Sequence, residues 1–336
     1  MAKLLFIIIG FEKPSSRKRV LDSRDYLGSR GHEVTVREVP KGGIGRVASM
    51  VGLWRYDLVV IQKKLFGRFE LGIISKVNPR LIYDFDDAVM FHEIERNEPL
   101  RGKYFTRFAA VCGRCLGVIA GNGTLAEFAR FARGTDERDP SVLVLPTPVD
   151  TEAVISKAYH TSGSGLRIGW MGTRGNLGHL MSVTAPLGRA MSGFPGTELV
   201  VVTDGLPRFD EDMPVRVKRW SAAEEAEDLR SFDIGIMPLK DNLWTRGKGG
   251  FKLLQYMAAG VPSVASPVGI NREIIEHGQN GFLAGNDSEW EECLRRLLAD
   301  AELRRRLGMN GRVTVESRFA LKDYSRRLAD FLEGFL

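Results

Sequence analysis

A loop rich in glycine and lysine, GKGGFK at residues 247–252, has the residue types needed to hold an anion. It follows the apolar stretch FDIGIMPL, which is typical of a buried strand, and runs into a helical pattern that ends at Gly260 before Pro262. The first N–H groups of a helix have no partner within the helix, and the helix dipole makes its start positive. Because glycines allow close backbone approach and lysines add charge, the loop predicts a phosphate or pyrophosphate site. An ordinary connection with solvated lysines is the alternative.

A second glycine-rich loop, GWMGTRGNLGH at residues 169–179, follows an earlier strand pattern in the same half of the chain. Its glycines recur at every third position, which is not the GxGxxG spacing of dinucleotide sites, and no acidic residue ends the next strand as NAD binding requires. The loop contributes one cation, Arg174, as the first loop contributes Lys248. Two such loops at strand ends predict a diphosphate more strongly than either loop alone.

Three carboxylates, Asp84, Asp86 and Asp87, follow the strand pattern LIY in the sequence LIYDFDDAVMFH. A carboxylate at the end of a strand can orient a hydroxyl group or take its proton, and His92 is close enough in sequence to assist. The Asp-x-Asp pattern has other uses, because it binds a divalent metal in some enzymes and supplies a nucleophile and an acid in haloacid dehalogenase-like phosphatases. Loop capping with solvated charge is the remaining alternative.

The elements that must position these residues alternate between strand and helix. Apolar strand patterns occur at residues 3–10, 33–39, 56–62, 79–85, 116–122, 141–146, 166–172, 197–205, 215–220, 232–239 and 261–266. Helical patterns occur at residues 15–32, 223–231, 251–259, 289–300, 301–308 and 321–336. Buried strands that alternate with helices predict an α/β fold with parallel, doubly wound sheets.

A domain boundary is predicted near residue 150. The chain has 336 residues, which suggests two domains of about 150 residues each. LPTPVD at residues 145–150 contains two prolines, and the segment after it ends in the small residues TSGSG. We therefore expect an N-terminal domain over 1–150 and a second over 151–315. Ligands of doubly wound sheets bind beyond the carboxyl ends of the strands, so the expected site is a cleft between the domains.

The net charge of +6 lies entirely in the first half, where residues 1–150 contain 24 Lys and Arg against 18 Asp and Glu. A basic half suits nucleic acid, an anionic membrane surface or a phosphorylated substrate, and it is also compatible with an ordinary soluble surface. No helix-turn-helix, zinc-finger or aromatic RNA-binding signature is present, so no nucleic acid partner is predicted. SSRKR at residues 15–19 places Arg17 where an acceptor phosphate would meet it, and KKLFGRF at residues 63–69 mixes cations with aromatic rings as a membrane-contacting surface does. For each segment an ordinary solvated surface is the alternative.

The lengths of the apolar runs and the number of cysteines indicate the compartment in which the protein works. The longest apolar run, residues 4–9, is well short of the ~18 residues that span a bilayer, and no cleavage site follows it. Three cysteines are too few for a disulfide framework, which favours the cytoplasm. Cys112 and Cys115 form a CxxC in an apolar segment with a helical pattern, where we expect packing, with redox and metal roles as alternatives.

Residues 239–284 resemble the donor-binding segment of retaining, family 4-like glycosyltransferases (glycosyl transferases group 1) of the GT-B fold. In that family a Lys-x-x-Glu-Tyr-Met-Ala-x-Gly-x-Pro-Val-Val-like helix and strand are followed by Asn-Gly-Phe-Leu, and this chain has KLLQYMAAGVPSVAS and NGFLA. VLPTPVD is similar to the family's linker signature. The resemblance covers residues 142–336 well and the first 140 loosely. It implies two tandem Rossmann-like domains with an interdomain cleft, and a last helix, 316–336, that crosses back to the first domain.

The resemblance implies transfer of a sugar, with retention, from a nucleotide-diphosphate sugar to a glycan or lipid-linked acceptor in cell-envelope polysaccharide or glycolipid synthesis. It implies no cofactor and no metal, and a location in the cytoplasm or peripherally at the inner face of the membrane. The implied catalytic residues are Lys248, Asp86, Asp87 and Arg174. The implied donor-binding residues are Gly172, Thr173, Arg174, Arg219, Trp220, Gly249, Gly250, Phe251, Lys252 and Gln255. The implied acceptor-binding residues are Arg17, Asp84 and His92.

The chain departs from the family pattern at two positions. The family often has two glutamates eight residues apart around the donor loop, the first contacting the sugar and the second the ribose, and here these positions are Gly247 and Gln255. These departures keep open a degenerate, non-catalytic protein that binds a nucleotide sugar. The Asp-x-Asp pattern keeps open a metal-dependent transferase or a phosphatase that uses Asp84 and Asp86.

Overall fold

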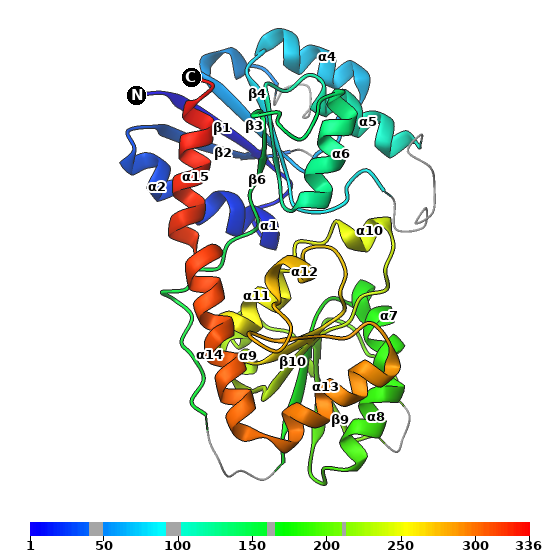
Figure 1. Cartoon of the computed structure of the whole chain (residues 1–336). Coiled ribbons are helices and arrows are strands. Elements are labelled where there is room, and N and C mark those ends of the chain that lie inside the picture. Colours follow the sequence, from blue (N-terminus) through cyan, green and yellow to red (C-terminus); the bar gives the residue numbers. More distant parts are fainter. Residues whose placement is uncertain (40–49, 92–101, 160–164, 210–212) are drawn as a thin grey trace. The chain divides into compact units, whose positions relative to one another are not determined.

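The computed structural model describes residues 1–39, 50–91, 102–159, 165–209 and 213–336. By contacts they form two compact units, of which the first is Met1–Pro148 with Asn242–Gly249 and Leu321–Leu336. The second is Val149–Asp241 with Gly250–Ala320. Each unit contains a six-stranded parallel sheet flanked by helices, as Figure 1 shows, so the predicted pair of doubly wound α/β units is confirmed.

In the first unit the strand order is β2-β1-β3-β4-β5-β6. The strands are β1 (Lys3–Ile8), β2 (Glu33–Glu38), β3 (Leu58–Gln62), β4 (Leu81–Phe85), β5 (Gly117–Ala120) and β6 (Val142–Val144). The helices are α1 (Pro14–Ser16), η1 (Arg17–Leu21), α2 (Arg24–Ser29), η2 (Leu53–Arg55), α4 (Arg68–Val77), α5 (Lys103–Cys112), α6 (Gly123–Arg133), α10 (Leu243–Arg246) and α15 (Leu321–Glu333).

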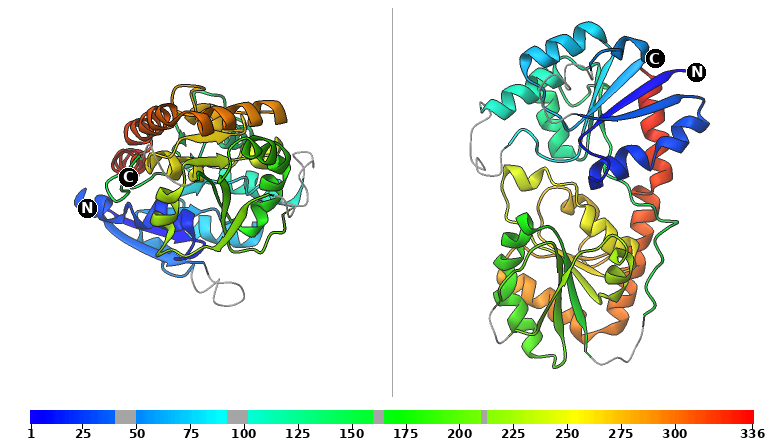
Figure 2. Two further views of the ribbon diagram at one scale, coloured as in Figure 1. Left: turned by 90° about the horizontal axis from the view of Figure 1, so that it is seen from below. Right: turned by 180° about the vertical axis from the view of Figure 1, so that it is seen from behind.

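The sheet of the first unit is covered on both faces. Leu5 and Ile7 of β1 belong to one buried cluster and Phe6 to another, because side chains alternate along a strand. Tyr324 and Leu328 of α15 lie in the same cluster as Phe6. Figure 2 shows α15 beside the strands of this sheet, with both chain ends in the first unit.

The helix predicted over residues 15–32 is wrong as a single element. It consists of α1, a π-helical turn η1 and α2, with Asp22 and Ser23 between the last two. The Asp22 N–H donates to the Arg17 carbonyl, five residues earlier, at 2.9 Å. A π-turn holds one residue more than an α-turn, which shifts the residues after it around the helix axis.

In the second unit the strand order is β12-β11-β10-β7-β8-β9. The strands are β7 (Arg167–Met171), β8 (Glu198–Thr203), β9 (Val215–Arg219), β10 (Ile234–Met237), β11 (Ser263–Ala265) and β12 (Phe282–Leu283). The helices are η3 (Arg174–Asn176), α7 (Leu177–Leu180), η4 (Met181–Val183), α8 (Thr184–Ser192), α9 (Glu225–Ser231), α11 (Phe251–Ala258), α12 (Asn271–Ile274), α13 (Asp287–Ala299) and α14 (Ala301–Arg318).

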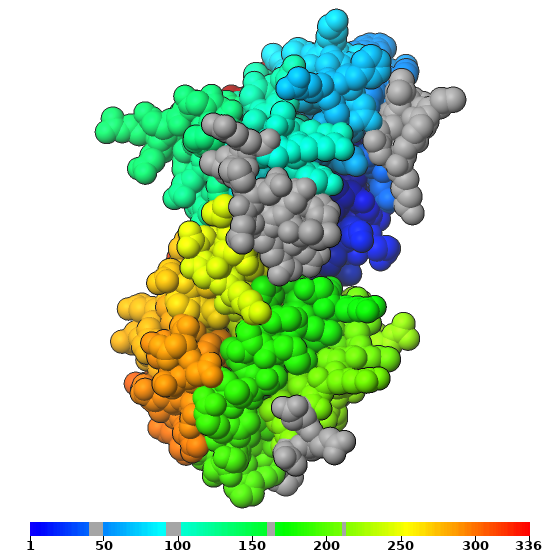
Figure 3. Space-filling model, turned by 90° about the vertical axis from the view of Figure 1, so that its right-hand side faces the viewer, coloured from blue at the N-terminus to red at the C-terminus, as the bar shows by residue number. Residues whose placement is uncertain are grey.

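Helices of the second unit lie on both faces of its sheet. α8 and α13 pack against each other, and their surfaces adjoin in Figure 3 (green and orange). α9 and α11 share a different buried cluster, which contains Leu229, Phe232 and Tyr256. α14 extends ten residues beyond the predicted end at 308, and β12 was not predicted.

The three cysteines are buried and unpaired. Cys112 ends α5, so the apolar segment around the CxxC is not one continuous helix, and Cys115 lies between α5 and β5. Burial raises the pKa of Cys112 well above its ordinary value and that of Cys115 to about 12. Buried neutral thiols of this kind support the packing interpretation. In the part of the chain that the structure describes, no helix is long and apolar enough to cross a membrane.

Candidate functional site

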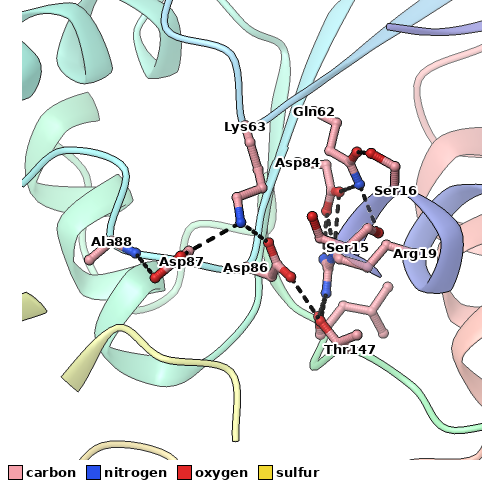
Figure 4. A network of polar contacts seen from close by, with 11 residues as sticks. Ser15, Ser16, Arg19, Gln62, Lys63, Asp84, Asp86, Asp87, Ala88 and Thr147 are labelled. Atoms are coloured by element: carbon pink, nitrogen blue, oxygen red, sulfur yellow. Dashed lines mark hydrogen bonds and ion pairs between the residues drawn. The ribbon is translucent and has the colours of Figure 1, made fainter. Parts of the chain in front are cut away.

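A buried ion pair lies at the carboxyl ends of β3 and β4 (Figure 4). Lys63 follows β3 and Asp86 follows β4, and the two strands are neighbours in the sheet. Lys63 Nζ lies 3.0 Å from Asp86 Oδ1 and 3.7 Å from Asp87 Oδ2. Among the described residues, Lys63 is the one non-glycine residue with a positive φ, 55°. A side chain is rarely held in this conformation unless its surroundings enforce it.

Charge pairing keeps both groups of this pair ionised. Burial opposes the charged form of each, but the attraction outweighs it. The pKa of Lys63 is therefore raised by Asp86 and Asp87, despite burial. The pKa of Asp86 is lowered by Lys63 and then by Arg19, again against the effect of burial. Asp87 is the more accessible carboxylate, with 39% of its side chain exposed against 13% for Asp86.

Asp84 lies inside β4 and forms a buried ion pair with Arg19. Asp84 is 3% exposed and Arg19, in the π-turn η1, is 1% exposed. Arg19 Nη2 donates to Asp84 Oδ1 at 2.5 Å, and its Nη1 donates to the Leu145 carbonyl at 2.8 Å. Gln62 Nε2 donates to the other Asp84 oxygen at 3.4 Å. This carboxylate therefore holds the first unit together, and the structure does not present it to an acceptor as predicted.

The other two predicted acceptor residues lie apart from this pair. Arg17 begins η1 and is exposed. His92 lies outside the described residues.

The two carboxylates of the Asp-x-Asp pattern each face a basic side chain. Asp84 pairs with Arg19, and Asp86 pairs with Lys63. Within the described residues, no group of three or more His, Cys, Asp or Glu side chains is arranged to hold a metal ion. A metal ligand or a nucleophile at Asp84 or Asp86 would have to leave its cation, which weighs against the metal-dependent and phosphatase alternatives.

Lys248 lies on a segment that groups with the first unit, although we predicted it in the second. Asn122, which caps the start of α6, donates its side-chain amide to the Lys248 carbonyl at 3.1 Å. Lys248 Nζ lies 3.8 Å from the centre of the Trp244 ring, a cation–π contact. The backbone and the ammonium of Lys248 are thus both positioned by neighbouring side chains.

Gly247 lies where no side chain fits. A Cβ built on it would lie 2.7 Å from Ala88 Cβ and 2.9 Å from Leu125 Cδ2. Gly250 is restricted in a second way, because its φ is +65° and a Cβ would lie 2.8 Å from both Ile270 and Ile274. These contacts explain two glycines of the loop by packing and backbone conformation.

The end of the GKGGFK loop, which belongs to the second unit, meets the other glycine-rich loop through Lys252. Lys252 is in the first turn of α11, and its Nζ lies 4.7 Å from the ring centre of Trp170 in β7. A Cβ on Gly172 would lie 2.4 Å from the same Nζ. Gly172 therefore leaves room for the ammonium, and the anion site expected from both loops stays a prediction. Phe251, predicted to bind the donor, is half-buried against the core of the unit.

The remaining predicted residues of the second glycine-rich loop, Thr173 and Arg174, are exposed. Arg174 is exposed, and its N–H donates to Asp204 Oδ1 at 2.5 Å. Thr173 precedes the short helix η3, and its hydroxyl accepts from Asn176 Nδ2 at 2.9 Å.

Two residues predicted to bind the nucleoside part of the donor, Trp220 and Gln255, both contact Glu225, which we did not predict. Arg219 ends β9 and Trp220 follows it, and both are exposed. Trp220 Nε1 donates to Glu225 Oε2 at 2.8 Å, and Gln255 Nε2 donates to Glu225 Oε1 at 2.8 Å. Glu225 begins α9, six residues after the end of β9, so the strand-end rule that selected Asp86 did not single it out.

The two sheets define an α/β protein of the GT-B fold. Residues 168–300, which lie mostly in the second unit, match the family model described as Glycosyl transferases group 1.

Among curated proteins, spore coat protein SA of Bacillus subtilis is 36% identical over 80 residues, 23% of this chain and 21% of that protein. N-acetyl-alpha-D-glucosaminyl L-malate synthase of Bacillus anthracis is 38% identical over 72 residues, 21% of this chain and 19% of that protein. The matched stretches thus span about a fifth of these relatives. Among solved structures, Anabaena HepE in complex with UDP and glucose superposes with a TM-score of 0.69 at 16% identity, over 99% of this chain and 100% of that one.

Proposed function

We propose that this protein is a glycosyltransferase that moves a sugar from a nucleotide-diphosphate sugar to a glycan or lipid-linked acceptor with retention. The observation that carries the proposal is the placement of the Lys252 ammonium against Gly172, within the matched domain. It puts a cation, held by a contact with the Trp170 ring, beside two glycine loops that begin beyond β7 and β10. The Anabaena HepE neighbour, solved with UDP and glucose, supports a donor of this class.

In this proposal the cations stabilise the leaving diphosphate. Negative charge develops on it as the bond to the sugar breaks, and donors fixed in advance lower the barrier because they need no reorganisation. Lys252 supplies one such charge in this proposal. Arg174 and Lys248 are retained as further diphosphate contacts from their positions in the sequence, together with the backbone of Gly249 and Gly250.

Asp86 and Asp87 are proposed to act on the sugar or on the acceptor. Lys63 keeps Asp86 ionised, which suits a carboxylate that orients a hydroxyl group or receives its proton. Asp87, the more accessible of the two, is the better placed to contact substrate. Lys63 is then a positioning residue for both carboxylates.

Thermal unfolding with added nucleotides tests the donor class. UDP, GDP, ADP and their sugars are screened, and the diphosphate that binds raises the unfolding temperature by mass action. Lys248→Ala is expected to weaken binding of that diphosphate at least tenfold, about the effect of one charged hydrogen bond, while the nucleoside is unaffected. Lys322→Ala, on the exposed side of α15, is the matched control. Equal losses for nucleoside and diphosphate would remove Lys248 from the phosphate site.

Turnover separates transfer from simple binding. The proposal expects donor hydrolysis or transfer that survives EDTA, and loss of transfer in Asp86→Asn with nucleotide affinity retained. Abolition by EDTA would move the chemistry to the Asp-x-Asp pattern. The packing around Gly247 supports one second candidate, a non-catalytic nucleotide-sugar-binding protein, because no side chain there reaches a sugar. The non-catalytic candidate is supported if the protein binds a nucleotide but modifies no acceptor from a broad set.

We place the activity at the cytoplasmic side, with peripheral contact to anionic lipid through the first unit. Not all of the predicted segment is available, since Lys63 is paired with Asp86 and Phe66 is 3% exposed. Phe69 on α4 is 78% exposed and follows the exposed Arg68. Phe69→Ala should reduce co-sedimentation with phosphatidylglycerol vesicles, and an unchanged bound fraction would exclude this surface. Cofactors and nucleic acid have no part in the proposal.

A further inference from the structure

Glu225 joins three elements of the second unit through its carboxylate. One oxygen accepts from Gln255 of α11, and the other accepts from the indole of Trp220 beyond β9, both at 2.8 Å. Both donors are neutral. Among the described residues, no lysine or arginine lies within ion-pair distance of Glu225. A carboxylate has about four acceptor positions, so two remain for a ligand.

The face of α11 that carries Gln255 also carries the predicted phosphate contact. Lys252 and Gln255 are three residues apart, which places them on one side of a helix about 4.5 Å apart along its axis. Lys252 lies against Gly172, and Gln255 lies against Glu225. Next to Glu225 is Trp220, which is 41% exposed. The order along this surface is a cation, a carboxylate with an amide, and an aromatic ring.

A nucleoside diphosphate carries its groups in the corresponding order. Its phosphates are anionic, its ribose presents two neighbouring hydroxyl donors, and its base is an aromatic ring. Hydroxyl groups bind well to an ionised carboxylate, because charge-assisted hydrogen bonds are stronger than neutral ones. We propose that Glu225 accepts hydrogen bonds from the ribose hydroxyls of the donor nucleotide and makes the site selective for ribonucleotides. Gln255 holds the carboxylate in place, and Trp220 lines the position of the base. This inference rests on the proposed donor class.

The test compares affinities of the full chain for UDP and 2′-deoxy-UDP by calorimetry, with the guanine and adenine pairs run in parallel and the tightest pair used. The wild-type protein should prefer the ribonucleotide at least tenfold. Glu225→Ala should lose most of that preference, with affinity for the ribonucleotide falling about tenfold and affinity for the deoxy form changing less than threefold. Glu225→Gln keeps the size of the side chain and tests the charge alone, with a loss in the same direction.

Glu224→Ala is the matched control, since the neighbouring Glu224 pairs with Lys218 and is half exposed. It should keep the wild-type preference. Parallel losses for both nucleotides in the Glu225 variants would mean that Glu225 only supports Trp220 and Gln255, and would overturn the inference. A wild-type protein that binds both forms equally would overturn it too, while leaving the proposed function intact. Failure to bind any nucleoside diphosphate would refute both.

Discussion

Replacing Lys63 by methionine should destabilise the first unit by about 3 kcal/mol at pH 7. Methionine keeps most of the apolar stem but removes the ammonium that lies 3.0 Å from Asp86 Oδ1. Breaking a buried ion pair by removing one partner typically costs about 3–5 kcal/mol, because the other charge stays buried. The lower end applies here, since Arg19 also stabilises the Asp86 charge and Thr147 Oγ1 donates to it at 3.4 Å.

Calorimetric unfolding measures this loss as a shift of the transition of the first unit. For a domain of this size, 1 kcal/mol shifts the unfolding temperature by roughly 2–4 °C, so the expected decrease is about 6–12 °C. The decrease should be smaller at acid pH. In the variant, Lys63 no longer opposes the effect of burial on the pKa of Asp86, so the carboxylate takes up a proton at a higher pH than in the wild type and less uncompensated charge remains.

The pH window of the wild-type pair follows from the two shifts. The lowered pKa of Asp86 stabilises the fold above its unfolded value of about 4, and this contribution is lost as pH falls through the folded value. The raised pKa of Lys63 stabilises the fold below about 10.4, and this contribution is lost as pH rises through the folded value. Between these limits the pair contributes fully.

Two controls decide whether the ion pair is the cause. Lys76→Met removes an exposed charge from α4 and should shift the transition by less than 2 °C. Adding Asp86→Asn to Lys63→Met should recover most of the loss, since no buried charge remains. The reasoning is refuted if Lys63→Met unfolds within 2 °C of the wild type, or if its decrease is the same at pH 5 and pH 7.

Three further predictions concern the glycines and the thiols. Gly250→Ala should cost about 2 kcal/mol or more in urea unfolding, because φ is +65° and Ile270 and Ile274 block the new methyl group, whereas Gly278→Ala, at φ +80° with open space, should cost only about 1 kcal/mol. Gly247→Glu should lower stability by about 2 kcal/mol without improving donor binding, since Ala88 and Leu125 fill the position; tighter donor binding would contradict this. All three cysteines should resist Ellman's reagent at pH 8 until the protein is unfolded, because burial raises their thiol pKa values, and rapid labelling of the native protein would argue against the packing role.

Most strands were predictable because they are short apolar runs bounded by turn residues, and β2 and β9 were predictable because apolar and polar residues alternate in them. All eleven predicted strand segments contain a strand of the structure, whereas β12, two residues long, gives too short a pattern to stand out. The π-turn at 17–21 was not predictable, because one extra residue in a turn leaves the composition of the helix unchanged. The grouping of Asn242–Gly249 with the first unit depends on contacts with Asn122 and Ala88, more than a hundred residues away in sequence.

The site was predictable as far as the strand-end rule reaches. That rule selected Asp86, Gly172 and the start of α11, but it does not say which charged side chains at strand ends are paired. Lys63 looked like part of a surface segment, yet it neutralises Asp86. Asp84 was expected to be accessible, yet it is buried and paired with Arg19, which lies 65 residues earlier in the sequence. Ion pairs between distant residues are decided by tertiary structure, so a single sequence carries no local signal for them.

The two missing glutamates of the donor loop have different structural meanings. At position 247 the space is filled by Ala88 and Leu125, so no side chain can be restored there without moving the first unit's own packing. At position 255 the glutamine lies 2.8 Å from a carboxylate that α9 supplies, so the acidic group is present on another element. In the proposed site, Glu225 replaces the carboxylate that Gln255 lacks next to the nucleoside, whereas no group replaces the one that Gly247 lacks next to the sugar. We therefore expect nucleotide affinity to be preserved and the choice of sugar to be altered. If the proposed function holds, the departure at Gly247 is expected to affect sugar choice and turnover, and the departure at Gln255 to affect neither.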